Sequence, residues 1–521
     1  MGHSSDTYLN PAPNKTIDYR ADRASEDPRT PNDEVHSKWE SWFAESQDRD
    51  LKYFIPDWDD LVDPRYDFEN ERYSNSKGPE DRGSGGWENE VFAHQLYDTP
   101  AYDGLLVSRE VLRKSKKRRK KMKDLGGVHR YLRVPPEFPI MGDCGAFGYV
   151  EAEEPPYSVD DVLDYYSRHG FNYGISVDHL VFGANDQDGR QYRYDITLKN
   201  ARDFYNKHKR RGLKWTPMAA VQGWDVASYV EAACACVEMG YTYLAIGGLV
   251  RSSTDEVLLI LRKIQEAVGE EIDLHALGVA RFAVIEDYLE IGITSMDSAT
   301  YLRRAWTSRK DNYWSREHLV FSAIRVPGPK RSLQAKARKE AKEDAKRRIE
   351  QDNFLEEEAW SEEKEKVFIE EKVESAKVDI LEKRLETARE MEADCFQALR
   401  AYDSVDDNSP SAIEVVDLLD EYQDYVGREC LRDHYWAMLH ARPWESCGCA
   451  ICEKSGIEVA IFRGNNRNRR RGFHNTRVFY DLLGEIQSGS NVSVKRGADV
   501  HNPSLNPVIR GQEPSLQHDL F

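Results

Sequence analysis

Three cysteines lie within six residues near the C-terminal end of the chain, as Cys447, Cys449 and Cys452, and His474 follows them. Three thiolates and one imidazole are a ligand set for one tetrahedral zinc ion, in a closed structural site with no open position for chemistry. A chance cluster or a disulfide is the alternative, but cysteines this close in sequence rarely bridge without strain. The spacing therefore predicts one structural Zn²⁺ held by these four residues, and it places the chemistry elsewhere.

Polar residues also end several short apolar runs in the first two thirds of the chain. Asp143, Asp178 and Asp297 each close such a run, and Gln222 closes another. Any one aspartate in this position could simply cap the helix that follows. Uncompensated carboxylates are costly to gather, however, so the set as a whole predicts a site that binds a metal or a positive ligand, or that works through a covalent bond.

The elements that must position these residues follow a regular rhythm. Amphipathic stretches at 159–168, 225–239, 254–268 and 282–291 predict helices that alternate with short strands. Eight strands with intervening helices predict an α/β fold of the (β/α)8 TIM-barrel class, in which active-site residues lie at the carboxyl ends of the strands. A doubly wound open sheet is the competing fold. The eight predicted strands are 104–107, 138–141, 173–177, 217–221, 243–246, 274–277, 293–296 and 319–324.

Shifts in composition divide the chain of 521 residues into five expected parts. Residues from about 330 to 405 are rich in Lys, Glu, Ala and Arg, which predicts either a helical pair of coiled-coil type or one solvated helix. The expected parts are an N-terminal arm, mobile up to about residue 45, with an irregular extension (1–100), the barrel (101–328), the charged helical insertion (329–410), the zinc-binding subdomain (411–488) and a disordered tail (489–521).

The chain carries no apolar run approaching 18 residues and no N-terminal signal of the secretory type. We therefore expect a soluble, cytoplasmic protein without a membrane partner. The remaining cysteines are scattered without a pairing pattern, which fits a reducing compartment. They are Cys144, Cys234, Cys236, Cys395 and Cys430.

Charge is distributed unevenly along the chain. The formal net charge is −19, which taken alone argues against a nucleic-acid partner. Basic runs nevertheless stand out at 114–123, 207–214 and 463–471. Each run alone could be no more than a solvated face, but three of them in an acidic protein favour a track for phosphates.

The motifs at the strand ends resemble, in combination, the tRNA-guanine transglycosylase superfamily. They are the DCGAF stretch at 143–147, the VQG stretch at 221–223, the IGGL stretch at 246–249, Asp297 and the cysteine–histidine set. The resemblance covers roughly residues 100–325 and 440–487, and it implies a zinc-containing (β/α)8 enzyme that exchanges guanine in nucleic acid for a 7-deazaguanine. The YDGLLVS and GISVDH stretches look most like the DNA-modifying branch called DpdA, which implies DNA as the polymer and a base of the preQ0 type.

The resemblance also implies roles for the residues. Asp297 would be the nucleophile that attacks C1′ of the target nucleotide and forms a covalent glycosyl ester, and Asp143 would handle protons and help to hold the base. Asp178 and Gln222 would read the amide and amine edge of the base. Gly247 and Gly248 would let the backbone approach the flat ring, and Leu249 continues their motif.

The sequence differs from the superfamily motif at three positions, and three other interpretations remain open. Cys144, Ala146 and Gly148 replace the usual Ser, Gly and Gln of the superfamily stretch, which puts tRNA in doubt as the substrate; Cys144 is expected to pack rather than react. A tRNA enzyme of the same chemistry, a non-catalytic subunit that binds nucleic acid and a structural zinc protein are the rival interpretations. The branch resemblance further suggests a partner ATPase of the same modification system, and a homo-oligomer stays open.

Overall fold

The computed structural model describes residues 39, 42, 43, 46, 49–57, 60–78, 80–355, 361–404 and 409–501. Nearly all of the expected mobile arm, and residues 502–521 of the expected tail, lie outside these ranges. The chain divides into two compact units. The barrel unit holds the residues up to Arg303 together with Asn475–Val492, and the helical unit holds Arg304–His474 together with the described residues from Ser493 onward.

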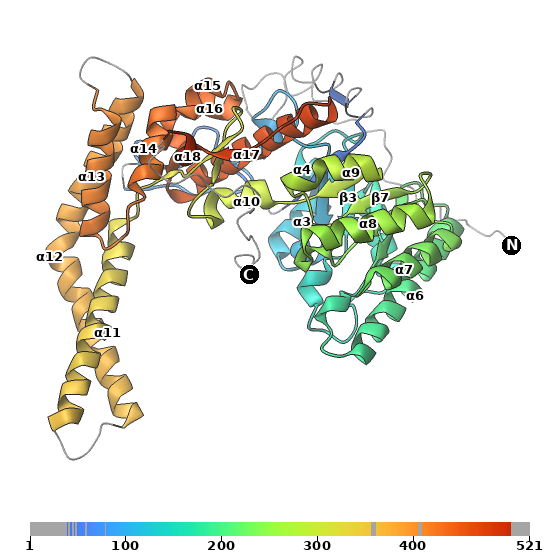
Figure 1. The fold of residues 1–521 in the computed structure, drawn as a ribbon, viewed down its shortest axis with the longest axis horizontal. Helices are drawn as coiled ribbons and strands as arrows, with labels where there is room; N and C mark the ends of the chain where they lie inside the picture. Colours follow the sequence, from blue (N-terminus) through green and yellow to red (C-terminus); the bar gives the residue numbers. More distant parts are fainter. Residues whose placement is uncertain are drawn as a thin grey trace. The chain divides into compact units, whose positions relative to one another are not determined.

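The barrel unit contains eight parallel strands that form a closed barrel, with β1 paired to β8 as well as to β2. Helices follow the strands and surround them (Figure 1). The predicted (β/α)8 class is therefore confirmed, and the open sheet is excluded. The strands are β1 (Lys52–Pro56), β2 (Gly104–Ser108), β3 (Ile140–Asp143), β4 (Tyr173–Ile175), β5 (Thr216–Val221), β6 (Tyr243–Ile246), β7 (Asp273–Ala276) and β8 (Ser295–Asp297).

Two strand predictions were wrong. Lys52–Pro56, which we expected in the irregular extension, is the first barrel strand, because Phe54 pairs with Gly104 on one side and with Asp297 on the other. The run at 319–324 contributes no barrel strand; it contains β10 (Leu319–Phe321), which lies in a three-stranded sheet of the helical unit. A five-residue strand between polar flanks shows only a weak alternation of apolar and polar residues, so it is hard to recognise in the sequence. The residues at 319–324 are apolar because they belong to the core of the helical unit.

Helices of the barrel unit begin and end at recognisable signals. Three of them are α5 (Val159–His169), α7 (Val226–Met239) and α8 (Thr254–Val268), and their N-terminal backbone amides are capped by Ser158, Asp225 and Ser253 respectively. Glycine in a left-handed conformation follows α5 and α7, which stops each helix before the next strand. The remaining helices are α2 (Arg109–Arg113), α3 (Lys116–Leu125), α4 (Val128–Leu132), α6 (Gln187–Arg211) and α9 (Ile285–Ile291).

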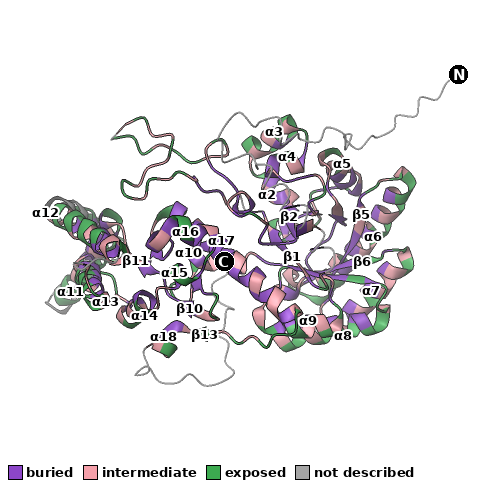
Figure 2. Cartoon of the chain, turned by 90° about the horizontal axis from the view of Figure 1, so that it is seen from above, coloured by how far each residue is buried: buried purple, intermediate pink, exposed green. Residues whose placement is uncertain are grey.

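Side chains fill the interior of the barrel. Phe54, Met141, Ile175 and Met218 are almost wholly buried, and Tyr243 packs with them. Figure 2 shows the strands as a buried centre and the surrounding helices with exposed outer faces. The barrel is thus a packed core, and its carboxyl-terminal rim is where a ligand can reach the polar side chains.

The helical unit contains two long helices that lie side by side, α11 (Pro329–Leu355) and α12 (Glu362–Ser404) (Figure 1). Of the two alternatives for this charged segment, the structure therefore shows the helical pair. Every fourth residue of α11 is buried against its neighbours, and three of these are alanines, which allow close approach of the helices. None of the described helices is at once long and apolar enough to cross a bilayer. The buried residues of this stripe are Leu333, Ala337, Ala341, Ala345 and Ile349.

Shorter elements complete the helical unit. Part of the expected disordered tail is ordered, since β13 (Lys495–Arg496) pairs with β10 and α18 (Gly497–His501) follows it. The others are α10 (Thr300–Thr307), shared with the barrel unit, β9 (Tyr313–Trp314), β11 (Ile324–Arg325), α13 (Ala412–Tyr425), α14 (Arg432–Ala441), α15 (Pro443–Ser446), α16 (Ala450–Ser455), β12 (Ile461–Phe462) and α17 (Gly464–Gln487), which also spans both units.

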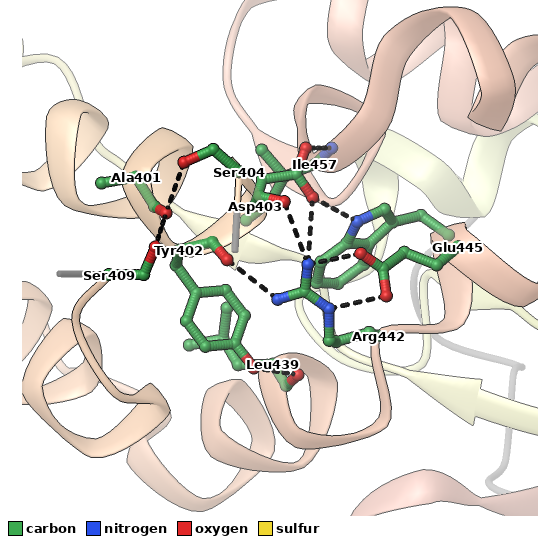
Figure 3. Close-up of polar contacts among 10 residues, drawn as sticks. Ala401, Tyr402, Asp403, Ser404, Ser409, Leu439, Arg442, Glu445 and Ile457 are labelled. Atoms are coloured by element: carbon green, nitrogen blue, oxygen red, sulfur yellow. Dashed lines mark hydrogen bonds and ion pairs between the residues drawn. The ribbon is translucent and has the colours of Figure 1, made fainter. Parts of the chain in front are cut away.

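One arginine joins the end of α12 to the segment that carries the cysteines (Figure 3). The Arg442 guanidinium donates to the carbonyl oxygens of Tyr402 (3.0 Å) and Asp403 (3.2 Å), which are last-turn carbonyls of α12, and it also donates to Glu445. The Asp403 carboxylate accepts from the Trp444 indole (2.7 Å) and from the backbone amide of Ile457 (3.0 Å). The helical pair is therefore anchored at its root on the residues around the cysteine cluster.

Candidate active site and metal centre

The predicted polar residues lie at one rim of the barrel. Asp143 ends β3, Asp178 and Gln222 follow β4 and β5, and Asp297 ends β8. Because all eight strands are parallel, their carboxyl ends meet at the same rim, which we call the mouth. The strand numbers expected from the sequence were shifted by one because the first strand was missed. Each polar residue was nevertheless assigned to the correct end of its strand, so the predicted group of residues does not change.

Asp178 and Gln222 form a buried pair at the mouth. The Gln222 amide Nε2 donates to Asp178 Oδ2 at 2.8 Å. The other two oxygens, Asp178 Oδ1 and Gln222 Oε1, are buried and have no hydrogen-bond partner among the described residues. Burial raises the pKa of Asp178 to about 6, against the lowering effect of the Gln222 hydrogen bond. Two adjacent buried acceptors without donors fit a ligand edge that presents N–H groups.

Asp143 has the properties of a proton carrier. Burial, together with the negative charges of Asp178 and Asp297, raises its pKa to about 7, although hydrogen bonds from the backbone amides of Gly145 and Cys144 partly offset the rise. A carboxyl group with a pKa near 7 can both give and accept a proton at neutral pH. Gly145 has a φ of 80°, and a Cβ there would lie 2.3 Å from the Ser108 hydroxyl, so the turn behind Asp143 requires glycine.

Asp297 is held through one of its two oxygens. Oδ1 accepts from the backbone amide of Gly278 at 2.7 Å and contacts His275 Nε2 at 3.1 Å. The described residues provide no hydrogen bond to Oδ2, so this oxygen is the one available to a ligand. An oxygen that accepts two N–H groups is fixed in place, and the orientation of the carboxylate is fixed with it.

A chain of buried polar groups continues from Asp297 into the barrel. His275 Nδ1 lies 2.6 Å from Ser295 Oγ, and Ser295 Oγ lies 2.6 Å from the Tyr243 hydroxyl. One consistent set of donors has Tyr243 donating to Ser295, Ser295 donating to His275 Nδ1, and His275 Nε2–H donating to Asp297. In this set of donors, the tautomer of His275 carries its proton on Nε2.

Sequence reasoning missed His275, Ser295 and Tyr243. The signal was present, because His275 and Ser295 are polar residues inside short, otherwise apolar strands, and they face each other as partners across β7 and β8. A polar residue buried in a barrel core needs a hydrogen-bond partner, and the partner here leads to Asp297.

The glycines of the IGGL stretch lie beside the Asp178–Gln222 pair. A Cβ on Gly247 would come within 2.3 Å of Gln222 Nε2, and Gly248 has a φ of 77°, so neither position accepts a larger residue without displacement. The Tyr229 hydroxyl donates to the Gly247 carbonyl at 2.8 Å and holds this segment. Leu249 is fully buried, so its side chain packs in the interior.

Two further residues of the DCGAF stretch differ in exposure. Cys144 is fully buried, and burial raises the pKa of its thiol well above the usual value, which agrees with a packing role. The Phe147 side chain is 51% exposed, and its ring centroid lies 5.7 Å from that of Phe182. Phe182 also contacts Arg251, whose guanidinium lies 4.5 Å from the centroid of the Phe182 ring. These three side chains give the mouth an aromatic and cationic border.

The four predicted zinc ligands form one buried cluster in the helical unit. Their ligand atoms all lie within 4.8 Å of one another. His474 Nδ1 lies 3.5 Å from the sulfurs of Cys447 and Cys449 and 3.3 Å from that of Cys452. A tetrahedral zinc ion with bonds of about 2.3 Å to sulfur and about 2.0 Å to nitrogen has nitrogen–sulfur edges of about 3.5 Å. The cluster thus has the dimensions that one such ion requires.

Surrounding groups orient these ligands. His474 Nε2 donates to the Trp314 carbonyl at 2.6 Å, so Nδ1 is the nitrogen that faces the sulfurs. The Tyr313 ring stacks on the imidazole with centroids 4.4 Å apart, and the Cys452 amide donates to the Cys449 sulfur at 3.4 Å. The set is closed by protein on all four ligands, as in a structural metal site, and it can hold one metal ion.

Comparison with known proteins agrees with this geometry. No protein-family model matches the chain. The chain is 32% identical over 454 residues to a DNA-guanine transglycosylase of Salmonella montevideo, and the match covers 83% of this chain and 96% of that protein. Identity at this level over nearly the whole relative, together with the barrel and the cysteine–histidine cluster, confirms the resemblance noted in the sequence. The chain belongs to the DNA-guanine transglycosylase family, the DpdA-like branch of the tRNA-guanine transglycosylase superfamily.

Proposed function

We propose that the protein replaces a guanine base in DNA with a 7-deazaguanine base of the preQ0 type, through a covalent intermediate on Asp297. The observation that carries the proposal is the state of Asp297, whose Oδ1 is fixed by Gly278 and His275 while Oδ2 is available. A carboxylate held in this way, next to a carboxyl group with a raised pKa, has the parts of a retaining glycosyl-transfer enzyme.

In the first displacement, Oδ2 of Asp297 attacks C1′ of the target nucleotide, and the bond between C1′ and the guanine nitrogen breaks. The electron pair of that bond leaves with guanine, and Asp143, which is partly protonated at neutral pH, gives it a proton. In the second displacement, the ring nitrogen of the incoming base attacks C1′, its proton passes to Asp143, and the ester bond to Asp297 breaks. Two inversions retain the configuration at C1′.

His275 supports both steps through Asp297. Hydrogen bonds from His275 and Gly278 stabilise the carboxylate, and this matters most when Asp297 must leave the sugar as an anion. His275 is therefore a positioning residue, and the Ser295–Tyr243 contact defines which of its nitrogens carries the proton.

The Asp178–Gln222 pair reads the base. The two orphaned oxygens, Asp178 Oδ1 and Gln222 Oε1, accept from the ring N–H and the exocyclic amino group of guanine. A 7-deazaguanine presents the same edge, so one pocket serves the leaving and the incoming base. Gly247 and Gly248 keep the backbone close to the ring plane, and the half-exposed Phe147 offers a face on which the ring can stack.

The cysteine–histidine cluster binds one Zn²⁺ in this proposal. The ion supplies no chemistry to the exchange; it holds the four ligands and, with them, the root of the helical pair.

DNA is the polymer because the relative named above is a DNA-guanine transglycosylase. The target nucleotide has to leave its helix to reach C1′, as in other enzymes that modify bases. A tRNA enzyme of the same chemistry is the second candidate, and the parts at the mouth suit either polymer.

The test uses purified protein, labelled preQ0, and duplex DNA and bulk tRNA in parallel, with Asp297→Ala as the control. Label in DNA that is lost in the variant supports both the chemistry and the polymer. Label in tRNA alone overturns the DNA assignment and keeps the chemistry. Label in neither polymer, with no adduct on Asp297, contradicts the proposal.

A further inference from the structure

The three basic runs found in the sequence have different environments in the folded chain. The arginines of the run at 463–471 mostly support the fold of the helical unit. Arg467, Arg470 and Arg471 are almost completely buried. Arg467 pairs with Glu458 at 2.5 Å, and Arg471 donates to the carbonyl oxygens of Val459 and Ile461. Side chains used in this way cannot contact phosphates, so the expectation of a track made from all three runs was wrong.

The run at 207–214 is compensated only in part, and it lies away from the mouth. Lys207 pairs with Asp160 at 2.6 Å and with Asp203 at 2.7 Å, and Arg211 pairs with Asp164 at 2.8 Å. These residues form the last turn of α6, which leads into the amino end of β5, at the opposite end of the barrel from the mouth. Cations at that end, whether paired or not, are too far from the mouth side to hold a polymer whose nucleotide enters the mouth.

The run at 114–123 forms α3, and this helix is fixed at the rim. Arg118 pairs with Asp57 at 2.5 Å and donates to the Tyr131 hydroxyl at 2.9 Å. Asp57 directly follows the carboxyl end of β1, so the contact attaches α3 to the mouth side. Ser115 caps the first turn, and Met122 is the buried apolar residue of the helix.

Two further cations of α3 form ion pairs, Lys120 with Asp124 and Lys121 with Glu88, and the other four point to solvent. Lys116, Lys117, Arg119 and Lys123 are exposed, and none of them has an ion pair within the described ranges. Figure 2 shows exposed stretches on α3. A ten-residue helix is about 15 Å long, which corresponds to about four nucleotides along one strand. Four uncompensated cations of this spacing, in a protein of net charge −19, create a local potential opposite to that of the whole.

We infer that the exposed face of α3, defined by Lys116, Lys117, Arg119 and Lys123, binds the phosphate backbone of the nucleic acid beside the nucleotide that enters the mouth. The inference rests on the proposed function for its partner, a duplex with a flipped nucleotide. The structural observation behind it is the Arg118–Asp57 ion pair, which holds α3 at the rim and leaves these four cations without ion pairs among the described residues.

A second basic helix in the chain provides a matched control. α11 exposes Arg338, Lys339, Lys342 and Lys346, but exposed Glu340 and Glu343 are interspersed with them. Reversing four cations on either helix changes the net charge by the same amount. Any difference between the two variants therefore reports on the site and not on the total charge.

The experiment measures binding of a fluorescent DNA duplex to the full chain by anisotropy, over a series of salt concentrations. The variants are K116E/K117E/R119E/K123E on α3 and R338E/K339E/K342E/K346E on α11. We expect the α3 variant to lose about 100-fold in affinity and to reduce the slope of log K against log salt by about 3 to 4, since each phosphate contact contributes about 0.9. The α11 variant should change the affinity by less than about threefold.

Three results would overturn the inference: full binding by the α3 variant, equal losses in both variants, or a loss confined to α11. A wild-type chain that binds no duplex would also overturn it. The set K116Q/K117Q/R119Q/K123Q, which only neutralises the charges, removes the same four contacts; it should show a similar change in slope, of about 3 to 4, and excludes an effect of introduced repulsion. Melting temperatures monitor folding. Labelling of DNA by the wild type and its loss in Asp297→Ala test the proposed function separately, because the α3 variants leave Asp297 unchanged.

Discussion

The mouth of the barrel and the cysteine cluster both bring ionisable side chains together, but they differ in whether the polar groups have partners within the protein. In the cluster, His474 Nε2 donates to the Trp314 carbonyl and Nδ1 faces three sulfurs, so the four ligand atoms face one another and can hold one metal ion. At the mouth, oxygens of Asp178 and Gln222 are buried without partners, and Asp143 has a pKa of about 7. A site that stabilises the fold satisfies its polar groups, whereas a site that binds a substrate keeps some unsatisfied until the substrate arrives.

The largest expected effect is a loss of activity without a loss of stability when Asp297, a residue of the mouth, is replaced. Asp297→Asn keeps an oxygen that can accept from Gly278 but removes the nucleophile, so we expect base exchange to fall by at least about 10⁴-fold. The melting temperature should stay within about 2 °C of the wild type. Exchange assays and thermal melts on the same samples check this, and residual exchange above about one per cent of the wild-type rate would contradict the role of Asp297.

Loss of the metal should show the reverse pattern. Cys452→Ser, or treatment with a chelator, removes a ligand set that contributes folding energy, and we expect the melting temperature to fall by about 10 °C or more, with activity declining in parallel. Cys430→Ser is the matched control because Cys430 is outside the cluster. Metal content by mass spectrometry accompanies the melts. Removal of the metal without a change in melting temperature would argue against a structural role.

An intermediate effect is expected at His275, which is buried but acts through Asp297. Gln can place an amide N–H where Nε2–H lies, and Phe cannot, so His275→Phe should lower kcat about 100-fold while His275→Gln recovers part of the loss. KM for the incoming base should change little in both, because His275 does not contact the base. Equal losses in kcat for the two variants, or a change confined to KM, would show that His275 only packs.

The smallest effect concerns pH. Because the pKa of Asp143 (about 7) and that of Asp178 (about 6) are raised in the folded protein, the folded chain binds more protons than the unfolded chain between about pH 4 and pH 7. The free energy of unfolding therefore decreases as pH rises through this window, and Asp143→Asn should remove part of the decrease, about 2 °C in melting temperature. Melts from pH 5 to pH 7.5 measure this, and parallel curves for the two proteins would contradict a raised pKa.

Much of the mouth could be predicted because strand ends are marked in the sequence. Asp143, Asp178, Gln222 and Asp297 follow apolar runs, and parallel topology brings such positions together without further information. The close spacing of Cys447, Cys449 and Cys452 was likewise enough to predict the cluster of possible metal ligands. These features depend on residues that are close in sequence or on a rule common to the fold.

Features that depend on pairing between distant segments were missed. β1 is recognisable only from its partners β2 and β8, and the role of His275 emerges only when Ser295 and Asp297 lie across from it. The buried Arg467 and Arg471 looked like surface charge because a sequence shows no acceptors. In each case the missing information is the identity of the neighbour.

The most direct test of the account is to trap the intermediate. The protein is incubated with duplex DNA in the absence of an incoming base, denatured and digested, and the peptide that contains Asp297 is analysed by mass spectrometry. We predict a nucleotide adduct on Asp297 that disappears when preQ0 is added before denaturation and that is absent from Asp297→Asn. Exchange without an adduct, or an adduct on Asp143 or Cys144 instead, would contradict the proposed chemistry.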